Sequence, residues 1–161
     1  MTLFETSLIG QAALVALQAG WLTIGVWGNI RHPEMNRAMV ADVMSMRPLR
    51  DRPDLFAELA PYRVEHPAAH RGLYAVIVAA EAVVALALWA GVALLLGAAL
   101  GAVQPETAQA FAVLAVIGFT AVWGAFLVGG EWFRYWAGFG EAQKTHFLMT
   151  IWGVATFAAM T

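Results

Sequence analysis

The chain has 161 residues, of which 61% are hydrophobic and 12% are charged. Soluble domains are about 45–50% apolar and about 25% charged, so this balance indicates a membrane protein. The formal net charge of −2 and the absence of cysteine exclude a basic nucleic-acid-binding surface, disulfide frameworks, thiolate metal sites and iron–sulfur clusters.

The first predicted transmembrane helix covers about residues 7–30. About 20 apolar residues suffice to cross the hydrocarbon, so this stretch is long enough. It is preceded by Glu5 and by no Lys or Arg, and it offers no small-residue cleavage site. We therefore expect a retained helix rather than a signal peptide. Gln11 and Gln18 are seven residues apart and share one of its faces.

Residues 31–71 form a loop that is too long for a simple connector. Its pattern predicts two short amphipathic helices that lie on the membrane surface. The first places four apolar side chains on one face: Met35, Met39, Val43 and Met46. Methionine-rich faces adapt to irregular partners, so Met35 and Met39, together with Phe56 of the second short helix, are candidate residues for docking a protein partner or a lipid. The alternative is that the loop caps its own helix bundle.

The second predicted transmembrane helix covers about residues 72–100 and contains Glu81 about ten residues from its start, which is close to mid-membrane. An ionisable residue at that depth is costly and is a functional hypothesis by default. One interpretation is a clamp in which Glu81 forms a hydrogen bond to Gln11 or Gln18 of the first helix. Contact with a partner protein and the handling of protons or ions are the alternatives.

The third predicted transmembrane helix covers about residues 108–130, and the aromatic sequence GGEWFRYWAGFG follows it at residues 129–140. Rings at such a position are typical of the membrane interface. The predicted interfacial anchors are Trp132, Arg134, Tyr135 and Trp136. Arg134 is expected to reach toward phosphate and to pair with Glu131. A docking surface for a partner or lipid is the alternative.

The fourth predicted helix covers residues 142–161 and reaches spanning length only with this early start. Seven arginines lie within residues 31–71, and Arg134 and Lys144 lie within the loop at residues 131–145. With four spans these two loops share one side, which the positive-inside rule places in the cytoplasm, with both termini in the periplasm. We therefore predict an all-α membrane protein with a single domain over residues 1–161. It has four transmembrane helices and a long amphipathic cytoplasmic loop between the first two.

His70 and His146 fall near the starts of the second and fourth helices. Two imidazoles at similar depth could ligate a haem b iron or another metal. The alternative is interfacial histidine bonded to a carbonyl or a headgroup. The sequence contains no nucleophile motif, phosphate-binding loop or paired catalytic carboxylates, so no catalytic residue and no cofactor are predicted, with haem b as the alternative.

Several motifs carry a family resemblance. They are a GN pair ending the first helix, MNRAMVADVM in the loop, HRGLYAVIVAAEAVVAL opening the second helix, and GGEWFRYWAG before EAQKTHF. With them the chain resembles the bacterial family of small integral membrane proteins called domain of unknown function 2165. The resemblance implies a four-helix membrane protein and brings no established activity.

These features predict a non-catalytic accessory subunit of a larger complex in the bacterial inner membrane. The complex would be respiratory, photosynthetic or transport-related, and the partners would be the lipid bilayer and other integral membrane subunits. The alternative is a small haem-binding redox anchor or a proton-linked carrier, acting through His70 and His146 or through Glu81.

Overall fold

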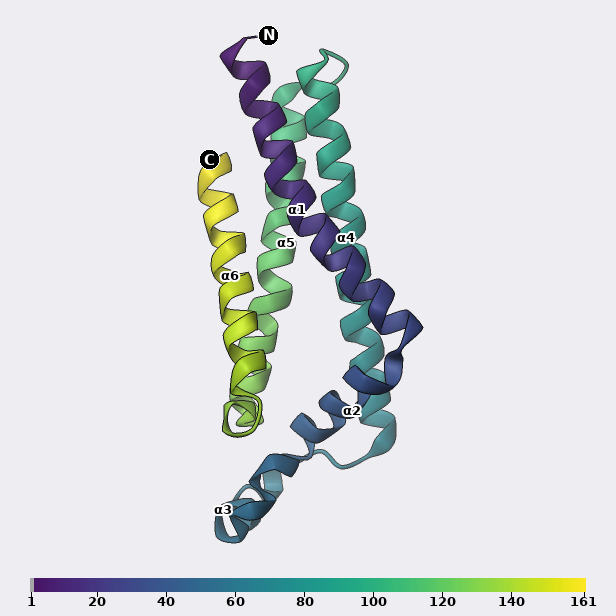
Figure 1. Ribbon diagram of the computed structural model, residues 1–161, viewed down its shortest axis with the longest axis vertical. Coiled ribbons are helices and arrows are strands. Elements are labelled where there is room, and N and C mark those ends of the chain that lie inside the picture. Colours follow the sequence, from purple (N-terminus) through teal and green to yellow (C-terminus); the bar gives the residue numbers. More distant parts are fainter. Residues whose placement is uncertain (1) are drawn as a thin grey trace.

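The computed structural model describes residues 2–161, and over that range it consists of helices without a strand. The long helices are α1 (Leu3–Arg31), α4 (Pro67–Ala99), α5 (Pro105–Trp132) and α6 (Gly140–Met160) (Figure 1). The short elements are α2 (Pro33–Met44), η1 (Arg47–Asp51), α3 (Pro53–Glu58), η2 (Ala60–Tyr62) and η3 (Tyr135–Ala137). Helices α1, α4 and α5 are long and apolar enough to cross a membrane. The prediction of an all-helical fold is thus confirmed, with three candidate membrane spans.

The long helices begin earlier than their apolar stretches. Helix α1 starts at Leu3 because Thr2 and Glu5 form a capping box: the Thr2 amide donates to Glu5 Oε2 (2.8 Å), and the Glu5 amide donates to Thr2 Oγ1 (3.2 Å). Helix α4 starts at Pro67 rather than at about residue 72, since proline suits the first helical turn and the His66 ring accepts the Ala68 amide (3.2 Å). Both helices therefore include residues that precede the apolar stretch predicted to cross the membrane.

The bundle consists of two helix pairs. Helix α1 packs along α4, α6 packs along α5, and α4 and α5 join the pairs. The largest fully buried apolar side chains between the helices are Leu8, Val15, Leu22, Leu88, Leu95, Val116 and Phe119. A Cβ added to Gly91 of α4 would lie 3.2 Å from Ala112 Cα of α5, so small residues permit these two helices to approach closely.

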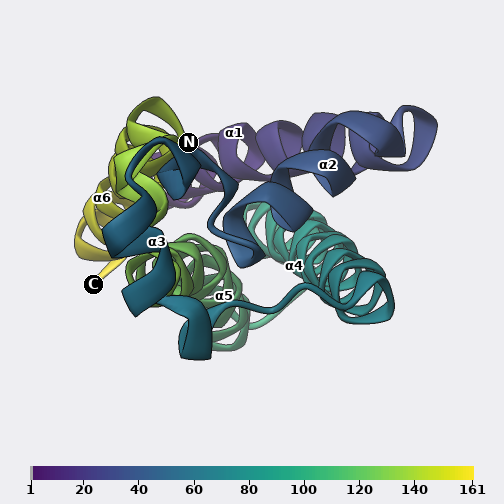
Figure 2. The ribbon, with the colours of Figure 1, turned by 90° about the horizontal axis from the view of Figure 1, so that it is seen from below.

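The two pairs separate toward the end of the bundle away from the termini (Figure 1). The α1–α4 segment, residues 32–66, lies beneath this end, with α3 below α5 and α6 (Figure 2). Helix α2 packs against α4, and Pro48 of η1 fits against Gly138, where an added Cβ would lie 2.1 Å from Pro48 Cβ. The segment therefore caps its own bundle, which was one of its two expected roles.

Gly153 provides a test of the α5–α6 packing. A Cβ at this position would lie 2.1 Å from Thr120 Oγ1 and 3.3 Å from Phe119 Cδ1. We expect Gly153→Ala to lower the stability by about 1–3 kcal/mol through overpacking, measured as a lower midpoint of thermal unfolding in detergent. The control is Gly124→Ala in α5, where the added Cβ meets nothing within 4 Å. Equal midpoints for the two variants would contradict the close packing at Gly153.

Candidate functional site

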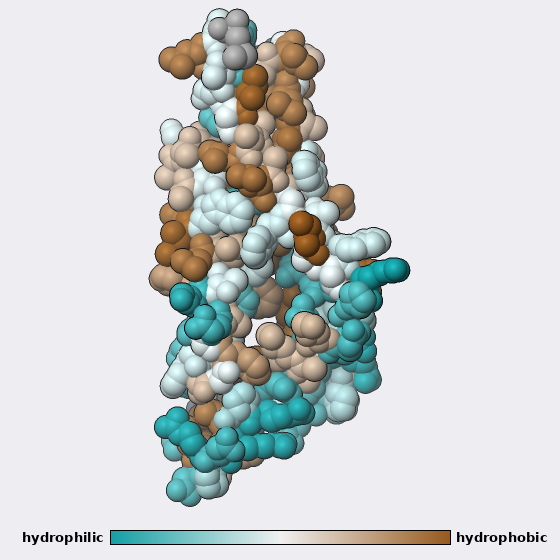
Figure 3. Space-filling model, in the orientation of Figure 1, coloured by the Kyte–Doolittle hydropathy of each residue, from teal (hydrophilic) through white to brown (hydrophobic). Residues whose placement is uncertain are grey.

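The separation of the helix pairs leaves a cavity of about 540 Å³, here called the bundle cavity. Its lining comes from α1, α2 and α4 on one side and from α5, η3 and α6 on the other. Figure 3 shows the hollow below the middle of the molecule, on the side of the bundle that the α1–α4 segment caps. Its volume is within the range of about 300–1,000 Å³ that is usual for ligand cavities.

One wall of the bundle cavity carries a hydrogen-bonded polar network made of Glu81, Asn29, Asn36 and Tyr74. Asn29 Nδ2 donates to Glu81 Oε2 (3.0 Å), and Asn36 Nδ2 donates to Asn29 Oδ1. The Tyr74 hydroxyl donates to the Asn29 carbonyl (2.7 Å). Glu81 is only 6% exposed and Asn29 only 7% exposed. The network links α1, α2 and α4 at the end where apolar packing between the helix pairs is lost.

The carboxyl of Glu81 does bond to α1, as expected, but Gln11 and Gln18 were the wrong partners. Gln18 donates instead to Thr156 Oγ1 (3.0 Å), and Gln11 accepts from Gln109 Nε2 (3.2 Å). Helices α1 and α4 are antiparallel, so Glu81 lies level with the last turn of α1. Gln18 lies about 16 Å from Asn29, toward the start of α1, and is out of reach of Glu81.

Asn29 could have been found from the sequence, since it lies about five turns after Gln11 and therefore on the same face of α1. Tyr74 likewise shares a face with Glu81, about two turns before it. Asn36 had no comparable signal, and neither did Trp123 and Phe126 on the opposite side of the cavity.

The opposite wall is a group of four rings, here called the ring stack: Trp123, Phe126, Tyr135 and His146. The Phe126 and His146 rings stack at 4.6 Å between centroids, and Trp123 lies 5.5 Å from His146. The Tyr135 ring stacks on His146 at 5.9 Å, with its hydroxyl 3.1 Å from His146 Nδ1. The buried Trp123 Nε1 has no hydrogen-bond partner among residues 2–161.

Tyr135 differs from its expected place in an exposed aromatic belt. It is 5% exposed, and it packs on Gly130, where a Cβ would lie 2.0 Å from Tyr135 Cε1. Burial raises the pKa of the Tyr135 phenol to about 12. The phenol therefore keeps its proton at neutral pH and can donate it to His146 Nδ1, which leaves the imidazole proton on Nε2.

The other predicted anchors are accessible. Trp132 is 58% exposed and meets the Tyr62 ring at 5.4 Å, and Trp136 is also exposed. Arg134 Nη1 forms an ion pair with Glu131 Oε1 at 2.7 Å, which confirms the expected pairing. These three side chains can therefore meet lipid headgroups, and their anchoring role stays a prediction.

The three predicted docking residues have different surroundings. Met35 is 72% exposed, whereas Met39 lines the bundle cavity. Phe56 has two guanidinium groups near its ring. The Cζ atoms of Arg50 and Arg63 lie 5.9 Å and 3.9 Å from the ring centroid. Of the three, Met35 is the one most open to a partner.

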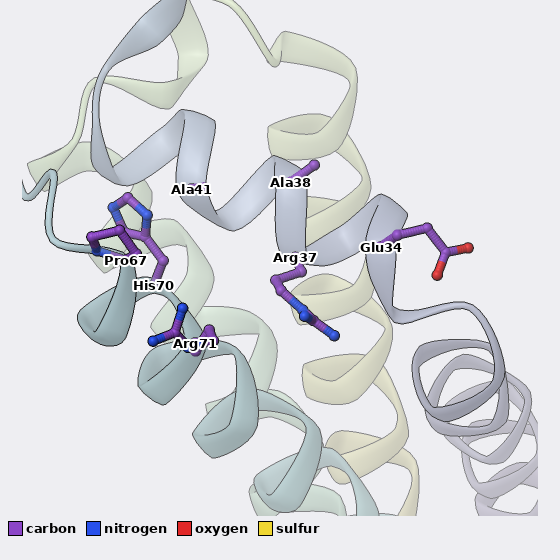
Figure 4. Close-up of a pocket in the computed structure, with 7 residues that line it drawn as sticks. All are labelled: Glu34, Arg37, Ala38, Ala41, Pro67, His70 and Arg71. Atoms are coloured by element: carbon purple, nitrogen blue, oxygen red, sulfur yellow. The ribbon is translucent and has the colours of Figure 1, made fainter.

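His70 lines a different and smaller cavity of about 360 Å³, between α2 and the first turns of α4. Figure 4 shows Arg37 extending from α2 toward α4 and Glu34 pointing away. The His70 Nε2 atom lies 2.7 Å from the Val64 carbonyl, which is the alternative expected for an interfacial histidine. Because His70 and His146 line separate cavities, their placement does not support ligation of one haem iron. No group of three or more metal-ligating side chains occurs in the described chain.

The family described as "Predicted small integral membrane protein (DUF2165)" matches residues 7–160. No curated protein and no solved structure matches this chain.

The bond between Asn29 and Glu81 is testable by a double-mutant cycle. We expect Asn29→Ala and Glu81→Ala each to lower the unfolding midpoint in detergent, because each removes one partner of a buried hydrogen bond. The coupling free energy between the two positions should be about 0.6 kcal/mol, as for other hydrogen bonds between membrane helices. A cycle of Gln18→Ala with Glu81→Ala is the control, since these two side chains have different partners. Additive effects at Asn29 and Glu81 would contradict the bond.

The burial of Tyr135 predicts that its phenol ionises at a higher pH than an exposed tyrosine. The absorbance change of tyrosinate at high pH should contain a component centred near pH 12 that Tyr135→Phe removes. Since the folded-state pKa is raised above 10.0, the stabilising contribution of the neutral phenol is complete below pH 10 and is lost as the pH rises through about 12. The wild type should therefore lose stability relative to Tyr135→Phe over this interval. A Tyr135→Phe titration identical to that of the wild type would refute the burial of this phenol.

Proposed function

Because this chain belongs to the DUF2165 family of predicted small integral membrane proteins, we propose that it is a non-catalytic accessory subunit of a larger complex in the bacterial inner membrane. The complex is of a respiratory, photosynthetic or transport kind. The match covers residues 7–160 and confirms the resemblance seen in the sequence. The family description gives the membrane location, and the accessory role is our inference.

The observation that carries this proposal is the uncovered apolar surface of α1 and α6. Each of these helices packs mainly on one neighbour. They leave large apolar side chains outside the bundle: Trp21, Ile24 and Trp27 on α1, and Phe147, Ile151 and Val154 on α6. Lipid covers such surfaces, and so does the apolar helix of another membrane subunit. The exposed Met35 extends this surface onto α2.

We further propose that α6 is the fourth span, with both termini in the periplasm. Its 21 residues give a length of about 32 Å, close to the thickness of the hydrocarbon. Contacts between η1 and η3 hold the α1–α4 segment and the α5–α6 connection at one end of the bundle. All nine cations of the chain belong to these two regions or to the adjacent helix ends, which favours a cytoplasmic location for that end.

A proton-linked carrier acting through Glu81 is the second candidate. The observation that favours it is the position of Glu81 in the lining of the bundle cavity, because intramembrane carboxyl groups at cavities are typical of proton pathways. Reconstituted vesicles with a pH-sensitive dye would test it, with the loss of proton flux in Glu81→Gln as the supporting result.

Photo-cross-linking in cells tests the accessory role. A photoreactive residue placed at Trp27 or at Met35 should capture the same membrane protein from both positions. A photoreactive residue at Leu114, which is exposed on α5, is the control and should capture lipid. The full chain extracted in a mild detergent should copurify with the captured protein. Lipid adducts alone at all three positions, together with a chain that purifies without any partner, would reject the accessory role.

A further inference from the structure

We propose that the bundle cavity binds a lipophilic monocation, which is a small molecule that carries one positive charge on an apolar skeleton. This inference concerns binding alone. It does not depend on the accessory role, and it holds whether or not the chain transports what it binds.

The charge of the lining points to a cation. Glu81 is the only acid, and no Lys or Arg occurs among the residues that line the bundle cavity. Arg37 lies over the Tyr74 ring at 5.8 Å but lines the smaller cavity. Within residues 2–161 Glu81 forms no ion pair. A charged carboxyl without a partner is costly in a low-dielectric site, so a bound cation would supply the missing counter-charge.

The hydrogen bonds of the polar network hold the Glu81 carboxyl in place as an acceptor. The amide of Asn36 donates to Asn29 Oδ1, and the amide of Asn29 donates to Glu81 Oε2, so the chain of donors ends at the carboxyl. Hydrogen bonds donated to an ionised carboxylate are stronger than those to a neutral group. Glu81 Oε1 makes no hydrogen bond in the part of the chain that the structure describes, which leaves it available to a ligand.

The ring stack forms a matching second wall. Its aromatic rings present π systems, which attract cations within about 6 Å of a ring centroid. Tyr74 and Phe133 add two more rings to the lining, and Met39 and Met44 add polarizable sulfur atoms. One wall therefore offers a carboxyl group and the other offers rings, with apolar side chains between them for the skeleton of the ligand.

The same chemistry disfavours other ligands. An anionic headgroup would face Glu81 without any Lys or Arg in the lining to balance it. A neutral amphiphile would fill the apolar space but would bring no charge to complement the acidic side chain of Glu81. A volume of about 540 Å³ suits a drug-sized molecule rather than a complete phospholipid.

Two ions of nearly equal shape and opposite charge provide the test: tetraphenylphosphonium and tetraphenylborate. The purified full chain in a nonionic detergent should bind tetraphenylphosphonium saturably in equilibrium dialysis, whereas tetraphenylborate should only partition into the micelles. Glu81→Gln should weaken the binding of the cation by about 30-fold or more, because it removes the charged partner from a buried site. Glu106→Gln, at the first turn of α5 and outside the bundle cavity, is the matched control and should bind like the wild type.

Unsaturable uptake of both ions would overturn the proposal, and so would equal saturable binding of both. Equal affinities of the wild type and a folded Glu81→Gln variant would also overturn it. If that variant fails to fold, the comparison of the two ions on the wild type still decides. A negative result would leave the accessory role untouched, since that role is read from cross-links on the outer surface.

Discussion

The carboxyl group of Glu81 is the physical constraint around which the loop-side half of this molecule is organised. A polar side chain inside a membrane-spanning helix requires partners from the protein itself, because the hydrocarbon offers none. Asn29 supplies the partner from α1, and Asn36 extends the network to α2. This network joins α1, α2 and α4 where the two helix pairs have already separated. The carboxyl thus holds one wall of a cavity that a purely apolar α4 would have no means to organise.

The two halves of the bundle consequently differ in how they are held together. Near the termini, small residues such as Gly91 and Ala112 let α4 and α5 approach closely, and leucine, valine and phenylalanine fill the space between helices. Near the loops, hydrogen bonds and ring contacts replace that packing, and the α1–α4 segment covers the opening. A tightly packed half supports an open half, which is a suitable arrangement for a binding site on a rigid scaffold.

The two inferences about function use different surfaces. The accessory role concerns the outer faces of α1 and α6, which are apolar and have little cover from this chain. Cation binding concerns the interior, where one carboxyl group faces a wall of rings. A subunit that binds a small cation inside and a larger membrane protein outside is consistent with both, because neither surface overlaps the other.

Local sequence patterns were sufficient to predict the all-helical class, the three apolar spans, the family and the presence of an acid, Glu81, inside the second span. Apolar length and the cost of an intramembrane charge are local properties, and they can be read residue by residue. The packing between helices was needed to show that Glu81 meets Asn29 rather than Gln11 or Gln18, and that Tyr135 turns inward onto His146. These outcomes depend on the relative depth of antiparallel helices and on where a glycine lets a ring approach. Helix depth and ring approach are set by packing between segments that are far apart in the chain. The sequence of one helix therefore does not reveal them.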